Sequence, residues 1–163
     1  MDIVNSVDLE FLVSYYELSK KGIRNTNNRS YEFVVLNYID SDIIFKLLKW
    51  FESNTGLKLK SYKNHLFIHQ YKVGDYFGKH RDSIEISNNN RAYVVGFNIN
   101  DDYEGGDYIL FNPDETINKA AGIPYYFKSD REHEITKIKK GIRKSAVLFI
   151  NYEDLEISKQ NLI

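Results

Sequence analysis

Two histidines and one aspartate have the residue types and spacing of a metal site. His80 and Asp82 are separated by a single residue. On an extended strand, residues i and i+2 lie on the same face, so this imidazole and this carboxylate can point at one ion. His133, which follows a predicted turn in a second strand-like stretch, is the best candidate for a third ligand. Such a set would leave other positions on the metal open, as a catalytic site requires.

An arginine ten residues after His133 suggests what else such a site binds. Alternation along residues 142–150 places Arg143 and Ser145 on one face with two apolar residues, so we expect a guanidinium deep in an apolar barrel. A buried arginine needs an anion, and its planar fork pairs well with a carboxylate. A dicarboxylate whose other end chelates iron would meet this need, and two histidines with one carboxylate suit a non-haem Fe(II) oxygenase.

The composition of the chain argues against several classes of partner and site. The chain has 163 residues, with 22 Lys and Arg against 23 Asp and Glu, so no basic field indicates a nucleic-acid partner. The absence of cysteine from the sequence excludes thiolate zinc sites, disulfides and cysteine nucleophiles. The amino-terminal sequence has neither a cationic flank nor a long apolar stretch. We therefore expect an intracellular, cytoplasmic protein with no membrane partner.

The first third of the chain is predicted to be partly helical. Apolar residues at helical spacing predict helices over residues 8–20 and about 42–53, and Gly56 ends the second. Between them, the polar, Asn-rich segment 22–30 is predicted to be a loop that precedes a strand over 32–36.

Beyond residue 58 the hydrophobic period changes to two, which favours short strands separated by turns. A hairpin turn is expected at Gly105-Gly106. The pattern predicts a mainly β (α+β) fold, a barrel or jelly roll with the N-terminal helices packed outside. We expect one domain over 1–163, with an N-terminal extension (1–30), a supporting strand–helix–strand region (31–75) and a catalytic core (76–152). The predicted strands are 58–62, 65–72, 91–99, 107–111, 123–128, 132–137 and 142–150.

Several motifs in fixed order are more specific than any one of them. They are Tyr71-x-x-Gly74, Tyr76-Phe77-x-x-His80-x-Asp82, Arg91, Asn100, Gly105-Gly106, Gly122, Phe127-x-Ser129-Asp130-Arg131-x-His133-Glu134-Ile135 and Gly141-x-Arg143. Over about residues 32–152 they resemble the iron(II) and 2-oxoglutarate-dependent dioxygenases, in particular the prolyl-hydroxylase-like branch. The resemblance implies that the barrel or jelly roll is a double-stranded β-helix.

The resemblance also implies a ligand for each site residue. His80, Asp82 and His133 would form the catalytic Fe(II) site, Arg143 would bind the far carboxylate of 2-oxoglutarate, and Tyr71 would lie beside this cosubstrate. Some protein prolyl hydroxylases of this branch have a tyrosine at the position of Asn98. A more polar pocket is therefore expected, in which Ser145 shares the carboxylate. Fe(II), 2-oxoglutarate and O2 are the expected cofactors and cosubstrates, with ascorbate as an optional addition.

The implied reaction hydroxylates an unactivated C–H bond and converts 2-oxoglutarate to succinate. The expected substrate is a prolyl or other residue in a protein or peptide, and the alternative is a free amino acid or small molecule. A nucleic-acid substrate is not expected, because residues 144–163 lack the second arginine of the demethylase branch. A metal- or ligand-binding β-helix without catalysis and a zinc hydrolase are the alternatives from other classes, although the hydrolase leaves Arg143 without an obvious role.

Further features lie outside the implied ligand set. Arg91 is a candidate substrate-binding residue at the cleft rim, although a structural role is equally compatible with its position. His69 shares the inward face with Tyr71 and is expected beside the metal ligands, whereas His65 is expected to be exposed. The polar segment 83–90 is expected to be a loop beside the metal, and in this family the corresponding loop often closes over substrate. The residues expected to form an aromatic lining are Tyr71, Phe97, Phe111, Phe127 and Phe149.

Overall fold

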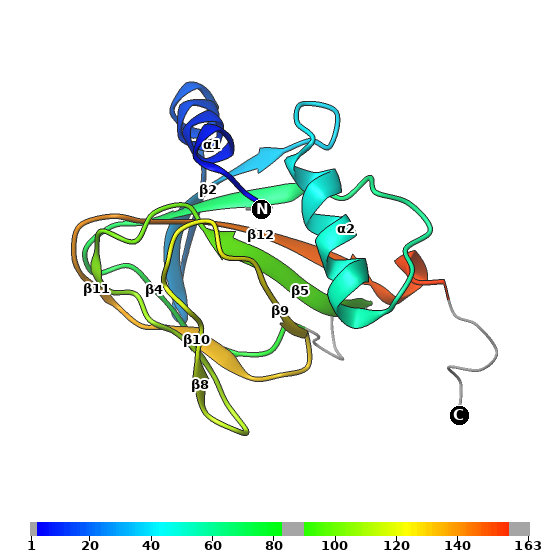
Figure 1. Cartoon of the computed structure of the whole chain (residues 1–163). Coiled ribbons are helices and arrows are strands. Elements are labelled where there is room, and N and C mark those ends of the chain that lie inside the picture. The colour runs from blue at the N-terminus through cyan, green and yellow to red at the C-terminus, as the bar shows by residue number, and fades with distance from the viewer. Residues whose placement is uncertain (1–2, 83–89, 157–163) are drawn as a thin grey trace.

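The computed structural model describes residues 3–82 and 90–156, which form two helices and a strongly curled antiparallel sheet (Figure 1). The helices are α1 (Ser6–Leu18) and α2 (Ile43–Thr55), and a short 3-10 helix covers Tyr152–Asp154. The strands are β1 (Gly22–Thr26), β2 (Arg29–Leu36), β3 (Leu66–Tyr71), β4 (Tyr76–His80), β5 (Arg91–Asn98), β6 (Glu104–Gly105), β7 (Tyr108–Leu110), β8 (Glu115–Thr116), β9 (Tyr125–Lys128), β10 (His133–Ile135), β11 (Ile138–Lys140) and β12 (Arg143–Asn151).

Ten strands form one sheet, in the order β8-β7-β10-β4-β2-β3-β12-β5-β9, with β1 paired to β2 at the side. The remaining strands, β6 and β11, pair with each other. The sheet curls so that β4 and β10 face the long strands β12 and β5 (Figure 1). The expectation of a mainly β barrel or jelly roll with helices outside is confirmed.

The two helices begin and end at residues with specific capping roles. In α1, the Asn5 side chain accepts the Asp8 N–H at 2.9 Å and the Asp8 carboxylate accepts the Asn5 N–H at 3.0 Å, which forms a capping box. The helix therefore begins at Ser6, two residues before its predicted start. Asp8 also pairs with Lys46 of α2 at 2.6 Å, which ties the two helices together. Gly56 ends α2 as predicted, in the left-handed conformation with φ +74°.

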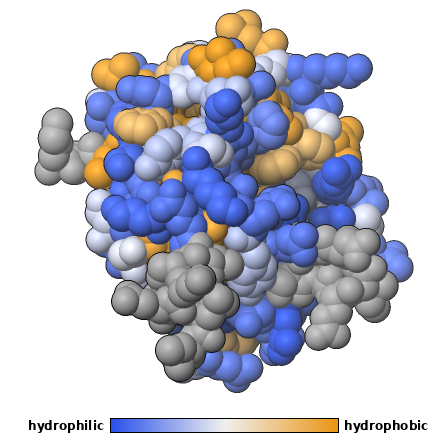
Figure 2. All heavy atoms as spheres, turned by 90° about the vertical axis from the view of Figure 1, so that its right-hand side faces the viewer, coloured by the Kyte–Doolittle hydropathy of each residue, from blue (hydrophilic) through white to orange (hydrophobic). Residues whose placement is uncertain are grey.

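The helices cover one face of the sheet and bury a continuous apolar layer, here called the helix-side core. α2 turns its apolar stripe toward this layer, as the 3.6-residue spacing predicted. Most of the surface on the α2 side of the molecule is hydrophilic (Figure 2). The helix-side core includes Leu12, Ile44, Leu47, Leu48, Phe51, Leu66, Ile68, Val95, Phe97, Ala146, Leu148 and Ile150.

The opposite face of the same strands lines the inside of the curled sheet, here called the barrel interior. Because side chains alternate along a strand, β12 sends Leu148 to the helix-side core and Val147 to the barrel interior. Phe97, which was predicted to line the interior, lies in the helix-side core instead. Its cross-strand partner on β12 is Ala146, which also lies in the helix-side core. The interior side chains are Tyr31, Tyr71, Val94, Tyr108, Leu110, Tyr125, Phe127, Ile135, Ile138 and Val147, with buried polar Asn98, His133, Arg143 and Ser145.

Three predictions about local structure are wrong. Residues 22–26 form strand β1, because their backbone pairs with β2 through a hairpin whose turn alone is Asn-rich. Residues 58–62 form no regular strand; Leu59 makes one bridge to Leu155, and its N–H is bound by the Glu52 carboxylate at 2.9 Å. Gly105 and Gly106 both have positive φ, but β6 pairs with β11 and β7 with β8 and β10, so these glycines form no hairpin turn.

Candidate metal centre

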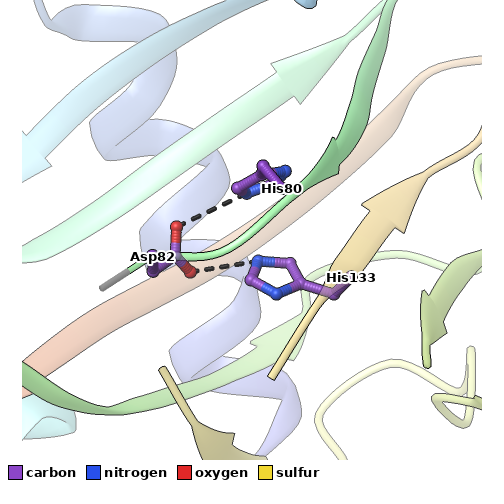
Figure 3. A group of neighbouring side chains, drawn as sticks. All are labelled: His80, Asp82 and His133. Atoms are coloured by element: carbon purple, nitrogen blue, oxygen red, sulfur yellow. Dashed lines mark ion pairs between the residues drawn. The ribbon is translucent and has the colours of Figure 1, made fainter. Parts of the chain in front are cut away.

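Three predicted ligands meet at the open end of the barrel, where β4 and β10 pair (Figure 3). His80 is the last residue of β4, and its direct cross-strand partner is His133, the first residue of β10. Antiparallel pairing thus brings together two histidines that are far apart in the sequence. Asp82 lies just beyond the end of β4, where its N–H donates to the Ser129 carbonyl at 2.9 Å. The predicted shared strand therefore ends at His80, and this turn positions the carboxylate.

The three side chains converge on a common point. Asp82 Oδ1 lies 3.4 Å from His80 Nε2, and Oδ2 lies 3.0 Å from His133 Nε2. One ligand atom from each residue lies within 4.8 Å of the others. An ion at the centre of the group would contact all three, so the geometry fits a metal bound by two imidazoles and a carboxylate.

The far side of each imidazole is held by the backbone. His80 Nδ1 lies 2.6 Å from the Gly78 carbonyl, and His133 Nδ1 lies 2.7 Å from the Arg131 carbonyl. A carbonyl only accepts, so each Nδ1 carries the proton and each Nε2 presents its lone pair to the centre. His80 also stacks on Phe77, with ring centroids 3.6 Å apart. Among the described residues, the buried His80 Nε2 has no hydrogen-bond partner, as expected of an atom that binds a metal.

The carboxylate is ionised in this environment. Burial alone would raise the pKa of Asp82, but the neighbouring side chains of His133 and His80 outweigh burial and hold the pKa below its usual value. An ionised carboxylate and neutral imidazoles are the protonation states in which these side chains bind metals.

A fully buried arginine lies at the inner end of the barrel interior. Arg143 is 0% exposed and donates from Nη1 to Ser145 Oγ at 2.8 Å and from Nη2 to Asn98 Oδ1 at 3.2 Å. Its guanidinium lies 5.3 Å from the ring centroid of Tyr71. Neither Arg143 Nε nor the Tyr71 hydroxyl has a hydrogen-bond partner in the described part of the chain. Arg143, Ser145, Asn98 and Tyr71, four residues predicted to bind the cosubstrate, therefore form one buried polar cluster.

The space between these side chains is small. The hollow bounded by His69, His80, His133, Tyr71 and Ser145 measures about 30 Å³, which is the volume of about one water molecule. A larger ligand between the metal centre and Arg143 must therefore displace lining side chains. Burial, followed by the charge of Arg143, lowers the pKa of His69 to about 3, so this histidine is neutral. His69 lines the hollow beside the ligands and His65 is exposed, both as predicted.

A larger cavity of about 310 Å³ lies outside this hollow and shares Asp82 with it. Arg91, predicted at the cleft rim, lines this cavity and stacks on Phe149, with its guanidinium carbon 3.6 Å from the ring centroid. Arg24 and Arg29 also line it, although the sequence analysis placed both in a linking loop. The two strand-like stretches around the Asn27-Asn28 turn were the signal for this hairpin. The expected loop over 83–90 lies outside the described residues except for Asn90.

Comparisons with known proteins agree with this geometry. The sequence profile of the 2OG-Fe(II) oxygenase superfamily matches residues 66–151, while no curated protein sequence matches the chain. A prolyl-4-hydroxylase from Pseudomonas putida has a TM-score of 0.68 at 13% identity, over 93% of this chain and 90% of that one.

Two further solved structures have the same fold. The viral collagen prolyl hydroxylase from Paramecium Bursaria Chlorella virus-1, in complex with 2OG, has a TM-score of 0.70 at 14% identity, over 91% of each chain. A prolyl hydroxylase from Trichoplax adhaerens, in complex with a fragment of the oxygen degradation domain of hypoxia inducible factor, has a TM-score of 0.69 at 14% identity, over 90% of this chain and 77% of that one. The predicted double-stranded β-helix is thus confirmed. In the described part of the chain, no helix is long and apolar enough to cross a membrane.

Proposed function

The chain belongs to the 2OG-Fe(II) oxygenase superfamily, and we propose that it hydroxylates an unactivated C–H bond of a prolyl or other residue in a protein or peptide. The family membership implies Fe(II), 2-oxoglutarate and O2 as the reagents of a prolyl hydroxylase-like dioxygenase. The choice of substrate and the role of each residue are the parts that we propose.

The observation that carries the proposal is the pairing of two sites in one barrel interior. His80, Asp82 and His133 would hold Fe(II), because their Nε2 and carboxylate atoms converge and the imidazoles are already oriented. Arg143 would hold the distal carboxylate of 2-oxoglutarate, since its buried Nε has no hydrogen-bond partner among the described residues. A metal- or ligand-binding domain without catalysis would not need this second, charged site.

The neighbouring residues orient the reactants and exclude water. Ser145 and Asn98 fix two guanidinium nitrogens of Arg143, so the arginine is preorganised for one carboxylate. The Tyr71 hydroxyl is free, within the described residues, to donate to the same cosubstrate. Burial raises the pKa of this hydroxyl, which therefore keeps its proton.

Loaded with these reagents, the site supplies oxidative decarboxylation of 2-oxoglutarate to succinate and CO2, with insertion of one oxygen atom into a C–H bond. The protein's own contribution is position and shielding. Tyr108, Tyr125 and Phe127 pack around His133 and each other on the inner side of the centre, so reaction with solvent is suppressed there.

A peptide substrate is favoured by the open cavity at the metal centre. The cavity of about 310 Å³ at Asp82 shares Phe67, Arg91 and Phe149 with a second cavity of about 300 Å³. These adjoining cavities, here called the groove, offer more space than one free amino acid requires. One solved structure of the same fold is described as bound to a peptide fragment, which supports the same choice for this chain.

The test is turnover of 2-oxoglutarate by the purified protein with Fe(II), O2 and ascorbate, followed by mass spectrometry of candidate peptides and lysate proteins. We expect succinate and a gain of one oxygen atom that depends on 2-oxoglutarate. The variant His80→Ala should abolish both products, whereas Glu10→Ala, at an exposed residue of α1, should retain them. Turnover that survives His80→Ala would refute the assignment, and oxygen gained only by a free amino acid would identify the alternative substrate class.

A further inference from the structure

Three arginines line the outer cavity at the metal centre, and each lies against an aromatic ring. The guanidinium carbon lies 4.8 Å from the Phe33 centroid for Arg24, 5.4 Å from Phe77 for Arg29 and 3.6 Å from Phe149 for Arg91. An arginine on an aromatic face is held in place and still presents its N–H groups at the edge.

The hairpin that carries two of these arginines is fixed to the metal-bearing strand. The Asn28 carbonyl accepts the Gly78 N–H at 2.7 Å, and the Asn27 carbonyl accepts the Tyr76 hydroxyl at 3.1 Å. A Cβ at Gly78 would lie 1.9 Å from Asn28 Oδ1 and 3.2 Å from the Asn28 carbonyl oxygen, so a larger residue there would push the Asn28 side chain aside. The β1–β2 hairpin is therefore a fixed wall of the cavity.

Among the described residues, no ion pair balances the positive charge of this wall. Within the described residues, Asp82 is the only carboxylate that lines the cavity, and none of the three arginines forms an ion pair. Asp82 is assigned to Fe(II), and the charges of Fe(II), Asp82, a 2-oxoglutarate dianion and Arg143 cancel one another. Within the part of the chain that the structure describes, the three cavity arginines thus have no counter-charge left even in the loaded enzyme, and a concave cationic surface attracts anions.

The cationic surface also continues beyond the metal centre. The second cavity, which shares Arg91, is also lined by Lys63. Among the described residues that line it, Asp154 is the one carboxylate, and it accepts the Asn151 N–H at 2.9 Å. A substrate that spans both cavities therefore meets the three arginines in the first and Lys63 in the second.

We propose that the substrate is an acidic peptide, in which Asp or Glu side chains on both sides of the hydroxylated residue bind Arg24 and Arg29 at one end and Arg91 at the other. This inference rests on the proposed hydroxylase function and specifies its substrate. Arginine clusters recognise acidic motifs by charge-assisted, two-pronged hydrogen bonds. The groove would therefore select its substrate by charge.

The test is the binding of fluorescent peptides to the protein loaded with Fe(II) and 2-oxoglutarate without oxygen, measured by anisotropy. Three peptides share a central proline and carry two Glu, two Lys or two Ser on each side. We expect the Glu peptide to bind at least about 10-fold tighter than the Lys peptide at low salt, and this preference to shrink in high salt as the charges are screened. Equal affinity for the three peptides would overturn the proposal.

Substitutions of the cavity arginines test whether the preference for the Glu peptide arises in this cavity. Arg91→Gln and Arg29→Gln should each weaken binding of the Glu peptide about 3- to 10-fold, as the loss of one charge-assisted contact predicts. Arg24→Gln, at an exposed side chain, tests the same charge without disturbing packing, and Lys140→Gln, at an exposed residue of β11, is the control for net charge. An effect of Lys140→Gln equal to that of the arginine variants would show a nonspecific field and contradict the proposal.

Two further measurements separate this proposal from its premise. Turnover of 2-oxoglutarate without peptide tests the hydroxylase function alone, since it does not depend on the cavity arginines. Turnover with charge-indifferent peptide binding would overturn only the acidic-peptide proposal, whereas absence of turnover would overturn the function. Free glutamate that displaces the Glu peptide at equal molar concentration would identify a small acid as the substrate and exclude the peptide.

Discussion

The helix-side core and the barrel interior are built by the same strands and have opposite chemistry. β12 contributes Ala146, Leu148 and Ile150 to the first, and Arg143 and Ser145 to the second. The helix-side core is an apolar layer in which the buried polar Glu52 is fully bonded. In the barrel interior, by contrast, the unpartnered polar atoms among described residues are His80 Nε2, the Tyr71 hydroxyl and Arg143 Nε.

This difference separates the source of stability from the source of function. Unsatisfied buried polar atoms cost about 1–3 kcal/mol each, so the interior destabilises the fold until ligands bind. The apolar layer under α1 and α2 offsets that cost, since burial of a large apolar side chain contributes about 1.5–3 kcal/mol. Substitutions on the two faces should therefore have different consequences.

The largest effect is expected at the metal centre. Asp82→Ala removes the only charged ligand of the predicted iron site, so Fe(II) binding and turnover should fall below detection. No apolar packing is lost, and the urea midpoint should shift less than in a helix-side core variant. Asp114→Ala, at an exposed aspartate, is the control. Full activity of Asp82→Ala would show that the interior does not hold the metal through this residue.

The next largest effects are expected at two adjacent residues of β12, Leu148 and Val147, which face opposite sides of the sheet. Leu148 is 0% exposed in the helix-side core, and Leu148→Ala should destabilise the protein by about 2–5 kcal/mol by opening a cavity. Its folded fraction should turn over at the wild-type rate. Val147 lines the hollow at the metal centre, so Val147→Ala should change the KM for 2-oxoglutarate at a smaller cost in stability. Urea unfolding and steady-state kinetics measure the two effects, and an equal effect of both variants on KM would contradict the separation.

A smaller effect is expected at the buried arginine. Arg143→Leu should raise the KM for 2-oxoglutarate about 10- to 150-fold, the equivalent of losing about 1.5–3 kcal/mol of charge-assisted hydrogen bonding. Fe(II) binding should persist, because the arginine is not a ligand. Without 2-oxoglutarate the variant should lose less stability than Leu148→Ala, because removal of a buried cation relieves a desolvation cost that offsets the lost hydrogen bonds to Ser145 and Asn98. Binding calorimetry tests the expected effect on 2-oxoglutarate and Fe(II) binding, and urea unfolding tests the expected effect on stability. A large loss of stability would show that Arg143 has a structural role.

The sequence predicted the centre because its signals are local or strictly ordered. The His80-x-Asp82 spacing, the alternation around Arg143 and Ser145, and the helical stripe of α2 depend on neighbours along the chain. The meeting of His80 with His133 required the ordered motifs as well, because strand pairing is not visible in either segment alone.

The wrong predictions of local structure lie where contacts with residues distant in sequence determine the conformation. The β1 hairpin was missed because its polar residues form a strand only by pairing with β2 and binding β4 through Asn27 and Asn28. Leu59 does not continue a strand because the Glu52 carboxylate binds its N–H. The face on which Phe97 lies depends on its register with Ala146. The cavity arginines could not be recognised as a cluster until these pairings placed them.

The smallest change in stability is expected at Glu52, a buried carboxylate of the helix-side core whose oxygens all have hydrogen-bond or ion-pair partners. Glu52 accepts the Leu59 N–H at 2.9 Å and the Tyr62 hydroxyl at 2.7 Å, and pairs with Lys49 at 3.1 Å. Burial alone would raise the pKa of Glu52, but these interactions outweigh it and hold the pKa below its usual 4.5. Glu52→Gln should therefore lower the free energy of unfolding at pH 7 by about 1 kcal/mol.

The stability difference between wild type and Glu52→Gln should depend on pH, and the direction of that dependence follows from the lowered pKa of Glu52. A carboxyl whose pKa is depressed by folding adds stability that is present above the unfolded pKa and is lost as pH falls through the folded pKa. The difference between wild type and Glu52→Gln should thus be constant above about pH 5 and shrink below it, while Glu10→Gln, at an exposed glutamate, should follow the wild type. Urea unfolding from pH 7 down to pH 3 tests this. A difference that grew on acidification would mean that burial dominates, and that the helix-side core tolerates an unsatisfied charge as the barrel interior does.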